Sequence, residues 1–409
     1  MRRARITPVN LNMLYPNPRH PRPAALRFLV CIAAIVLLAP PFCSAQEAPD
    51  LDYAMMAGRI VGALKIRQGE KVILRADPVY FRELVAPVRQ RLQEAGAGEI
   101  IELTYVPLGA PALQGSSSAP DPALKKLLES AEVYIWLPEQ VGVRGTPAGE
   151  VAALREWLDQ GGRHRQVHFH WSRGSVRADG LAGEHTPELD QVYQQALAAD
   201  CRAIGLAQDR VIHVMRLGTA RMRTPAGTDL KFRVGRRPFN KQDGDLSAAR
   251  LRRAKIRIDR EAELPCGVLR VAPIEESVEG VIIIPEARFG GRVAREVRLE
   301  IRRGQVVSSG ARQNSRAVKQ VLREGGRAAR SFREFGLGFN AMLVPPPDSG
   351  ILPYFGYGDG VVRLSLGDNT ELGGYVSGDF VRWFFFPDAT VEVLGRVLVR
   401  DGKLTEDFR

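Results

Sequence analysis

Short apolar runs alternate with amphipathic segments of helical period over the first half of the sequence, and this alternation limits the possible folds most. Strands separated by helices assemble into parallel sheets, because each helical crossover returns the chain to the edge where the next strand starts. The order therefore predicts a doubly wound α/β domain. No glycine-rich phosphate loop follows these strands, so the dinucleotide-binding motif is missing. The expected strands are 71–74, 99–105, 133–137 and 167–171, and the expected helices are 53–64, 78–95 and 150–158.

The pattern changes after a helix expected at 187–206. From Val211 onward, short alternating runs broken by Gly and Pro indicate mostly β-structure. We therefore expect an α/β fold in which an N-terminal doubly wound parallel-sheet domain, residues 46–190, precedes a mostly antiparallel β-rich α+β domain, residues 191–409. Within the second domain we expect hairpins at 297–308 and 390–399, turning at Arg303-Gly304 and near Gly395, and one helix at 314–325.

The first 45 residues have the pattern of a secretory signal peptide. They contain six Arg and no acidic residue, an apolar run from Phe28 to Leu38, and small residues ending at Ala45. Eleven apolar residues are few for a bilayer span, so an uncleaved anchor is the weaker alternative. Met13 is an alternative start. We expect cleavage after Ala45, export to the periplasm or the extracellular space, and no membrane span afterwards.

Removal of this leader halves the net charge. The chain has 58 basic and 46 acidic residues, so losing six Arg leaves 52 against 46, a net charge of +6 instead of +12. The Arg are scattered, without a basic stripe interleaved with aromatic residues, and we expect no nucleic-acid partner. Cys201 and Cys266 are then the only cysteines. In an oxidising compartment they form one disulfide or remain two buried thiols, and spacing alone leaves both open.

Three segments of the second half carry a family resemblance: Pro225–Arg236 (PAGTDLKFRVGR), Leu264–Gly280 (LPCGVLRVAPIEESVEG) and Glu334–Asn340 (EFGLGFN). In order and spacing they resemble the thermophilic metalloaminopeptidases, the leucyl aminopeptidase-like aminopeptidase S/T group. The resemblance implies a homodimeric two-domain hydrolase that releases N-terminal residues from peptides. It also implies two divalent metals held by two Glu, two His, one Tyr and one Asp.

The sequence departs from this family at most of the metal-ligand positions. Glu334 matches the second family Glu, whereas Val268 stands at the position of the first and Arg363 at that of the first His. No Tyr occurs in residues 368–374. Arg382 and Phe384 stand at the positions of the final His and Asp, and a shift of one residue recovers no His. Val offers no donor atom and a guanidinium repels a cation, so the chain is identified as a divergent member that lacks most metal ligands.

Two functional hypotheses follow from this substitution pattern. In the first, the chain is a pseudoenzyme without a metal cofactor, inactive as a peptidase, whose cleft binds a peptide or a small anionic ligand. Glu334 then pairs with the Arg that replaced the His ligands. In the second, a rebuilt site uses zinc, cobalt or manganese and the chain remains an active aminopeptidase. The candidate cleft residues are Glu275, Glu276, Arg363, Arg382, Asp359 and Asp368.

Three further groups allow more than one interpretation. His168 and His170 alternate along an expected strand, so they form either part of a metal site or a polar strand face beside a cleft. Asp359, Asp368 and the nearby oxygen donors Asn369, Glu371 and Asp379 suit either calcium or turns. The aromatic run 383–386 (WFFF) is typical of a core or a dimer contact.

Overall fold

The structure is a computed structural model. It describes residues 51–77, 82–104, 119–137, 148–171, 176–177, 186–344, 351–352 and 356–409. The expected leader, residues 1–45, lies outside the described residues. Residues 51–409 form one unit by their internal contacts.

A five-stranded parallel sheet forms the first layer, in the strand order β2-β1-β3-β4-β9. Its first four strands lie within two residues of the expected bounds, and β1 is buried along its whole length. The fifth comes from far along the chain and pairs with β4 in parallel. The strands are β1 Val72–Ala76, β2 Ile100–Thr104, β3 Val133–Trp136, β4 Arg165–Phe169 and β9 Glu261–Leu264.

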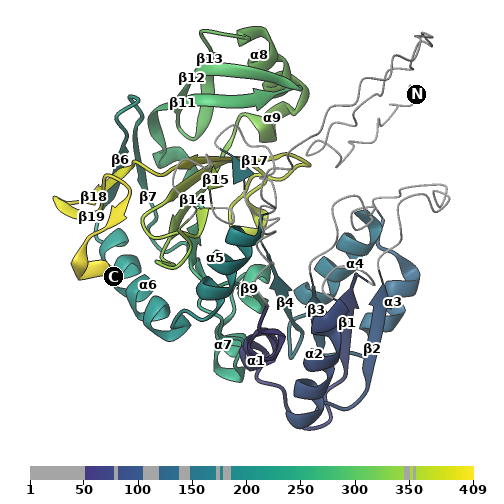
Figure 1. The fold of residues 1–409 in the computed structure, drawn as a ribbon. Helices are drawn as coiled ribbons and strands as arrows, with labels where there is room; N and C mark the ends of the chain where they lie inside the picture. Colours follow the sequence, from purple (N-terminus) through teal and green to yellow (C-terminus); the bar gives the residue numbers. More distant parts are fainter. Residues whose placement is uncertain are drawn as a thin grey trace, which may run out of the picture. The chain divides into compact units, whose positions relative to one another are not determined.

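Helices cover both faces of this sheet (Figure 1). Helices α1 (Tyr53–Leu64) and α2 (Arg82–Glu94) pack in one apolar cluster with Val72, Leu74 and the other residues that share their face. Helices α3 (Pro122–Leu128) and α4 (Ala148–Asp159) pack on the opposite face, in a second cluster around Ile73. Because strand side chains alternate between the two faces, the prediction of a doubly wound α/β arrangement is confirmed.

Antiparallel sheets make up most of the second half, as expected. A five-stranded sheet has the order β17-β16-β14-β10-β8, and an eight-stranded sheet has the order β13-β12-β11-β7-β6-β18-β19-β20. The first comprises β8 Phe239–Lys241, β10 Val268–Val271, β14 Phe332–Gly338, β16 Val362–Gly367 and β17 Val381–Phe386. The second comprises β6 Thr219–Arg223, β7 Asp229–Arg233, β11 Glu279–Phe289, β12 Arg292–Arg302, β13 Gln305–Gly310, β18 Thr390–Val393, β19 Arg396–Arg400 and β20 Lys403–Leu404. A short pair joins β5 Val176–Arg177 to β15 Ile351–Leu352.

In the second half of the chain, the turn and helix signals of the sequence predict elements at the correct positions. The β12–β13 hairpin turns at Arg303-Gly304 and the β18–β19 hairpin at Leu394-Gly395, and all four residues have positive φ. The expected helix near 314–325 is α8 (Ser315–Glu324), followed by α9 (Gly326–Ala329). Among the described helices, none combines the length and the apolar character needed to cross a bilayer.

The helix expected at 187–206 is two helices. Helix α5 (Pro187–Leu197) ends before Asp200, and the Asp200 carboxylate accepts hydrogen bonds from the backbone N–H groups of Arg202 and Ala203 to start α6 (Cys201–Met215). Such N-capping begins a new helix. Cys201 at this start forms a disulfide with Cys266, with a Cα–Cα distance of 6.1 Å, which resolves the question left open by the sequence.

Strand β9 also bears on where the chain divides into domains. It comes from residues 261–264, beyond the expected boundary at 190/191, and yet it completes the parallel sheet. The chain then passes through Pro265 and Gly267 directly into β10 of the antiparallel sheet. One short segment therefore links the two layers, while the boundary itself remains a prediction.

Candidate functional site

Three neighbouring strands of the antiparallel sheet place two arginines over one glycine. Arg270 on β10 stands opposite Gly336 on β14, which stands opposite Arg363 on β16. Side chains of directly opposed residues lie on the same face of a sheet. A Cβ added at Gly336 would lie 3.3 Å from Nε of Arg363, so the missing side chain leaves the space in which Arg363 lies across the sheet.

Glu334, two residues before Gly336, lies at the centre of a buried cluster of arginines. Its Oε1 accepts hydrogen bonds from Nε of Arg363 at 3.0 Å and from Nε of Arg270 at 3.3 Å. Its Oε2 accepts from Nη1 of Arg333. Glu334 is 0% exposed, and the three arginines are between 2% and 5% exposed. The carboxylate is therefore fully engaged by guanidinium groups.

Two further glutamates complete this cluster. Glu371, on the short helix η6 (Thr370–Leu372), accepts from Nη2 of Arg270 at 2.8 Å and also from Arg333. Glu263 on β9 accepts from Nη1 of Arg270 at 3.3 Å. Although burial alone would raise it, the neighbouring Arg333 and Arg270 lower the pKa of Glu371 to about 2. Three glutamates, Glu263, Glu334 and Glu371, thus face three arginines, Arg270, Arg333 and Arg363, which we call the Arg-cluster.

The parallel sheet supplies a second polar face. Gln166 and His168 on β4 stand opposite Glu261 and Glu263 on β9, and Trp136 on β3 stands opposite His168. The Trp136 and His168 rings are stacked with centroids 4.7 Å apart. Nε2 of Gln166 donates to Glu261, and Oε1 of Gln166 has no hydrogen-bond partner within the described residues.

A cavity of about 310 Å³ lies where these two faces meet. We call it the main cavity. Its size is at the lower end of the range for small-molecule sites. Its polar lining is Arg155, Gln166, His168, His170, Arg257, Glu261, Glu263, Arg270, Arg363 and Glu371, and its apolar and aromatic lining is Trp136, Val151, Leu154, Leu158, Ile258, Tyr357 and Trp383.

Burial sets the protonation of the other lining groups. It lowers the pKa of His168 to about 4, and it lowers the pKa of His170 well below its ordinary value, with a further contribution from His168. Burial, followed by repulsion from Glu263, raises the pKa of Glu261 to about 8. Near pH 7 both imidazoles are therefore neutral and Glu261 is a neutral carboxyl that can donate a hydrogen bond.

The charges that line the main cavity then sum to an excess of positive charge. Arg155 and Arg257 line the cavity in addition to Arg270 and Arg363, against two acidic residues, Glu263 and Glu371. Arg257 pairs with Asp159 at 2.9 Å, whereas Arg155 forms no ion pair among the described residues. This lining therefore favours an anionic ligand. The neutral imidazoles and the protonated Glu261 can also form hydrogen bonds with an anion.

Two of the sequence candidates meet at this site. Arg363 lines the main cavity and pairs with Glu334 directly behind it. Val268 is buried on β10, two residues before Arg270. Glu334 therefore pairs with Arg363, as expected, but not with Arg382, the other arginine expected to pair with it.

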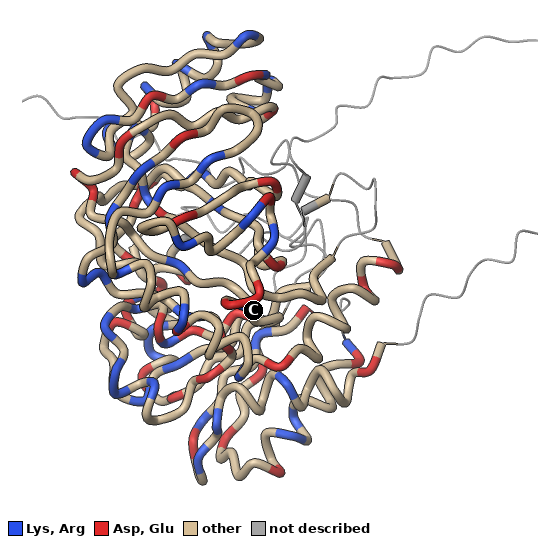
Figure 2. The backbone as a smooth tube through the Cα atoms, turned by 90° about the vertical axis from the view of Figure 1, so that its left-hand side faces the viewer, with Lys and Arg blue, Asp and Glu red and all other residues tan. Residues whose placement is uncertain are grey.

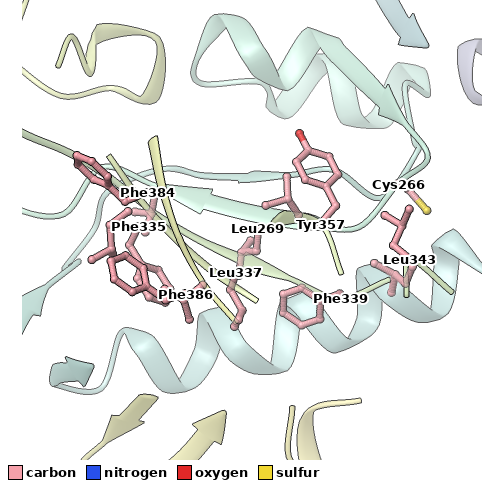
Figure 3. Packing of buried hydrophobic residues seen from close by; sticks show 14 of the residues in the cluster. Cys266, Leu269, Phe335, Leu337, Phe339, Leu343, Tyr357, Phe384 and Phe386 are labelled. Carbon is pink, nitrogen blue, oxygen red and sulfur yellow. The ribbon is translucent and has the colours of Figure 1, made fainter. Parts of the chain in front are cut away.

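Arg382 and Phe384 do not reach the main cavity. The strand register opposes Trp383 to Ser365 and Phe385 to Arg363, so Arg382 and Phe384 lie on the other face of β17. The Arg382 guanidinium instead lies 3.7 Å from the centre of the Phe289 ring and donates to the carbonyl of Arg288. Phe384 packs beside Phe335 in the core (Figure 3).

The remaining cleft candidates lie outside the cavity lining. Glu275 pairs with Arg237 and accepts from Nδ2 of Asn369 at 3.0 Å, and Glu276 takes no part in the lining. Asp359 pairs with Arg409 at 3.5 Å. Asp368 accepts from the backbone N–H groups of Thr370 and Gly378. Turn and ion-pair contacts therefore account for Glu275, Asp359 and Asp368.

The residues that sequence reasoning missed are Arg270, Arg333, Glu261 and Glu263, and Glu371 was named only as an oxygen donor for calcium or a turn. Arg270 could have been found, because residues two apart on a strand share a face and Val268 was already placed there. The glutamates of β9 gave no such signal, because their position depends on pairing with β4 about a hundred residues earlier. The prediction that His168 and His170 form a polar strand face beside a cleft is confirmed.

The residues at this site do not fit the pair of divalent metals that the family resemblance implies. Both oxygens of Glu334 are held by guanidinium groups, Arg363 projects where an imidazole would be needed, and Val268 has no donor. No group of three or more His, Cys, Asp or Glu side chains in the described part of the chain could hold a metal ion.

Comparison with known proteins identifies the fold. No protein-family model and no curated protein sequence matches the chain. The solved structure of wild-type AmpT from Thermus thermophilus, an aminopeptidase, is similar with a TM-score of 0.58 and 17% identity over 86% of this chain and 98% of that chain. A 2,5-dihydroxypyridine dioxygenase from Pseudomonas putida KT2440 is similar with a TM-score of 0.56 and 16% identity over 87% of this chain and 98% of that chain. The chain therefore has a distant aminopeptidase-like fold, and these two neighbours perform different reactions, so the fold alone assigns none.

Proposed function

We propose that this chain is an exported, catalytically degenerate relative of the aminopeptidase S/T family whose main cavity binds a small carboxylate-bearing ligand. The observation that carries the proposal is the enclosure of Glu334 by Arg270, Arg333 and Arg363. A carboxylate so engaged cannot also coordinate a cation without losing these bonds. The Cys201–Cys266 disulfide supports export, because disulfides persist mainly in oxidising compartments.

The walls of the main cavity define the ligand further. Trp136, Tyr357 and Trp383 form an aromatic wall that suits a flat apolar body, while Arg155 offers its charge to an anionic group at the more exposed end. Oε1 of Gln166 can accept one hydrogen bond from a ligand donor. An aromatic monocarboxylate satisfies the first two requirements, and benzoate is the simplest probe.

Calorimetric titration of the full chain tests whether the main cavity binds a carboxylate-bearing ligand. Benzoate should bind, and its uncharged isostere benzamide should bind at least about tenfold more weakly, because one charged hydrogen bond is lost. Arg155→Gln should weaken benzoate binding, whereas Arg298→Gln, an exposed arginine on β12, should not. Equal binding of benzoate and benzamide would contradict the anionic ligand.

Metal analysis and a peptidase assay test the other part of the proposal, that the chain is catalytically degenerate as a metallopeptidase. The purified chain should contain substoichiometric zinc, cobalt and manganese, and should not cleave leucine p-nitroanilide after these metals are added. Stoichiometric metal together with chelator-sensitive cleavage would instead establish an active aminopeptidase with a rebuilt site. The homodimer implied by the family resemblance is tested by light scattering of the same sample.

A further inference from the structure

A second pocket, about 430 Å³ in volume, lies apart from the main cavity and is lined by four arginines. They are Arg67, Arg163, Arg252 and Arg260, and the lining contains no acidic residue. Elsewhere Lys and Arg are mostly interspersed with Asp and Glu along the chain (Figure 2). We call this site the four-arginine pocket.

The topology of the parallel sheet brings three of these arginines together. Arg67 precedes β1, Arg163 precedes β4 and Arg260 precedes β9. Strands of a parallel sheet all start at the same edge, so the three connections meet there. Arg252, from helix α7 (Ala248–Arg253), completes the group. The grouping of these arginines therefore follows from the order of the strands in the sheet, and not only from the conformations of flexible side chains.

The Arg260 guanidinium is held in place by neutral groups. Its Nη1 donates to the carbonyl oxygens of Gly162 at 3.1 Å and His164 at 3.4 Å, and its Nη2 donates to that of Leu251 at 3.5 Å. A Cβ added at Gly161 would lie 3.2 Å from Nη2, so this glycine turn leaves room for the guanidinium. Carbonyl groups fix the orientation of Arg260 without neutralising its charge.

Two carboxylates near the pocket have other hydrogen-bond partners, although their charges also act on Arg67 and Arg260. Glu70 pairs with the buried Arg165 at 2.6 Å, and Asp259 accepts a hydrogen bond from the backbone N–H of Lys255 at 3.0 Å. Within the described residues, none of the four arginines forms an ion pair. Four like charges around one hollow repel one another, and an anion with several oxygens offsets that repulsion best.

We infer that the four-arginine pocket binds a phosphate group, either as free phosphate or as a phosphomonoester. Guanidinium forks match phosphate oxygens in pairs, and a dianion neutralises more of the local charge than a monocarboxylate does. The pocket volume exceeds that of inorganic phosphate, which leaves space for an ester group. The inference uses none of the residues of the main cavity and stands independently of the function proposed for it.

The test is a calorimetric titration of the full chain with inorganic phosphate at constant ionic strength set by chloride. Wild type should bind phosphate, and Arg163→Gln and Arg252→Gln should each weaken binding about tenfold, because each removes one charged hydrogen-bonding fork. Arg298→Gln and Arg316→Gln are matched controls, since both arginines are exposed and outside the pocket. They should change the affinity less than about twofold, as expected where only net charge changes.

Two outcomes would overturn the inference. One is a wild-type phosphate response no larger than that to chloride, and the other is an equal loss of affinity in the control and pocket variants. Thermal unfolding without phosphate checks that each variant is folded, and two pocket positions are tested so that one misfolded variant leaves a second measurement.

Sedimentation with vesicles containing phosphatidic acid distinguishes a lipid from a soluble source of the phosphate group. Vesicle binding that free phosphate displaces indicates a lipid phosphomonoester, and phosphate binding without vesicle binding indicates a soluble one.

Discussion

Gly336 shows how one small residue permits a concentrated ionic network. A side chain there would meet both Nε of Arg363 and Oε1 of Glu334 at 3.3 Å. Without it, the Arg363 guanidinium has room beside Gly336 to donate hydrogen bonds to the Glu334 carboxylate. Buried charges persist only when each is paired, and in the Arg-cluster every guanidinium reaches Glu334. The network therefore depends most on that one carboxylate.

Glu334→Ala should reduce the free energy of unfolding by about 3–5 kcal/mol, because it leaves buried arginines without their shared partner. Urea denaturation followed by tryptophan fluorescence measures the change. Glu156→Ala is the matched control, since its ion pair with Lys125 is exposed and contributes little. A loss no greater than that of the control would show that the Arg-cluster is not a stabilising network.

Glu261 should make stability depend on pH. Its pKa is about 8 in the folded chain against 4.5 ordinarily, so the folded state keeps a proton that the unfolded state releases. Stability that is fully present below pH 4.5 is therefore lost as the pH rises towards 8. Glu261→Gln removes this loss, and the variant should gain on the order of 2 kcal/mol relative to wild type between about pH 5 and pH 9. If the urea midpoints of the two proteins changed with pH in the same way across this range, the raised pKa of Glu261 would be contradicted.

The register of β17 shows where sequence reasoning about single residues fails. A shift of one residue moves every side chain to the other face, and the aromatic run from Trp383 offers no polar alternation to fix the register. Arg363 was predictable because the family resemblance places it at the position of a metal-binding His. Glu261 and Glu263 were not, because their place in the site depends on a strand pairing between distant segments.

At the scale of elements, local signals predicted most helices and hairpins. The turns at Arg303-Gly304 and Leu394-Gly395 need positive φ, and glycine supplies it at the second position of each. The break between α5 and α6 was missed because apolar residues keep helical spacing across it, and only the Asp200 cap marks the new start. Neither local signal indicates which strands from distant segments will pair.

The disulfide between Cys201 and Cys266 joins the start of α6 to the connection between β9 and β10. It closes a loop across 65 residues, so it restricts the unfolded chain substantially. Replacing both cysteines with Ala should reduce the free energy of unfolding by about 2–4 kcal/mol. Urea denaturation checks this, and wild type with dithiothreitol should behave like the variant. An unchanged midpoint for the double variant would argue against a stabilising role.

At the scale of the whole molecule, β9 ties the two layers together. It pairs with β4 in the parallel sheet, and Ala262 and Leu264 share an apolar core with Val167 and Phe169 of β4. Four residues later the same segment becomes β10 and carries Arg270 into the Arg-cluster. Unfolding either sheet therefore removes support from the other.

We expect the described unit to unfold in one cooperative transition. Fluorescence of the tryptophans and far-ultraviolet circular dichroism should give the same urea midpoint for the full chain. A fragment of residues 46–190, which ends before β9, should be much less stable, because the edge of β4 loses its pairing partner and part of its apolar cover. Appending residues 255–272 through a Gly/Ser linker should recover stability, and the same linker with a scrambled segment should not. A fragment 46–190 that unfolds at the midpoint of the full chain would show instead that the predicted boundary at 190/191 separates two independent domains.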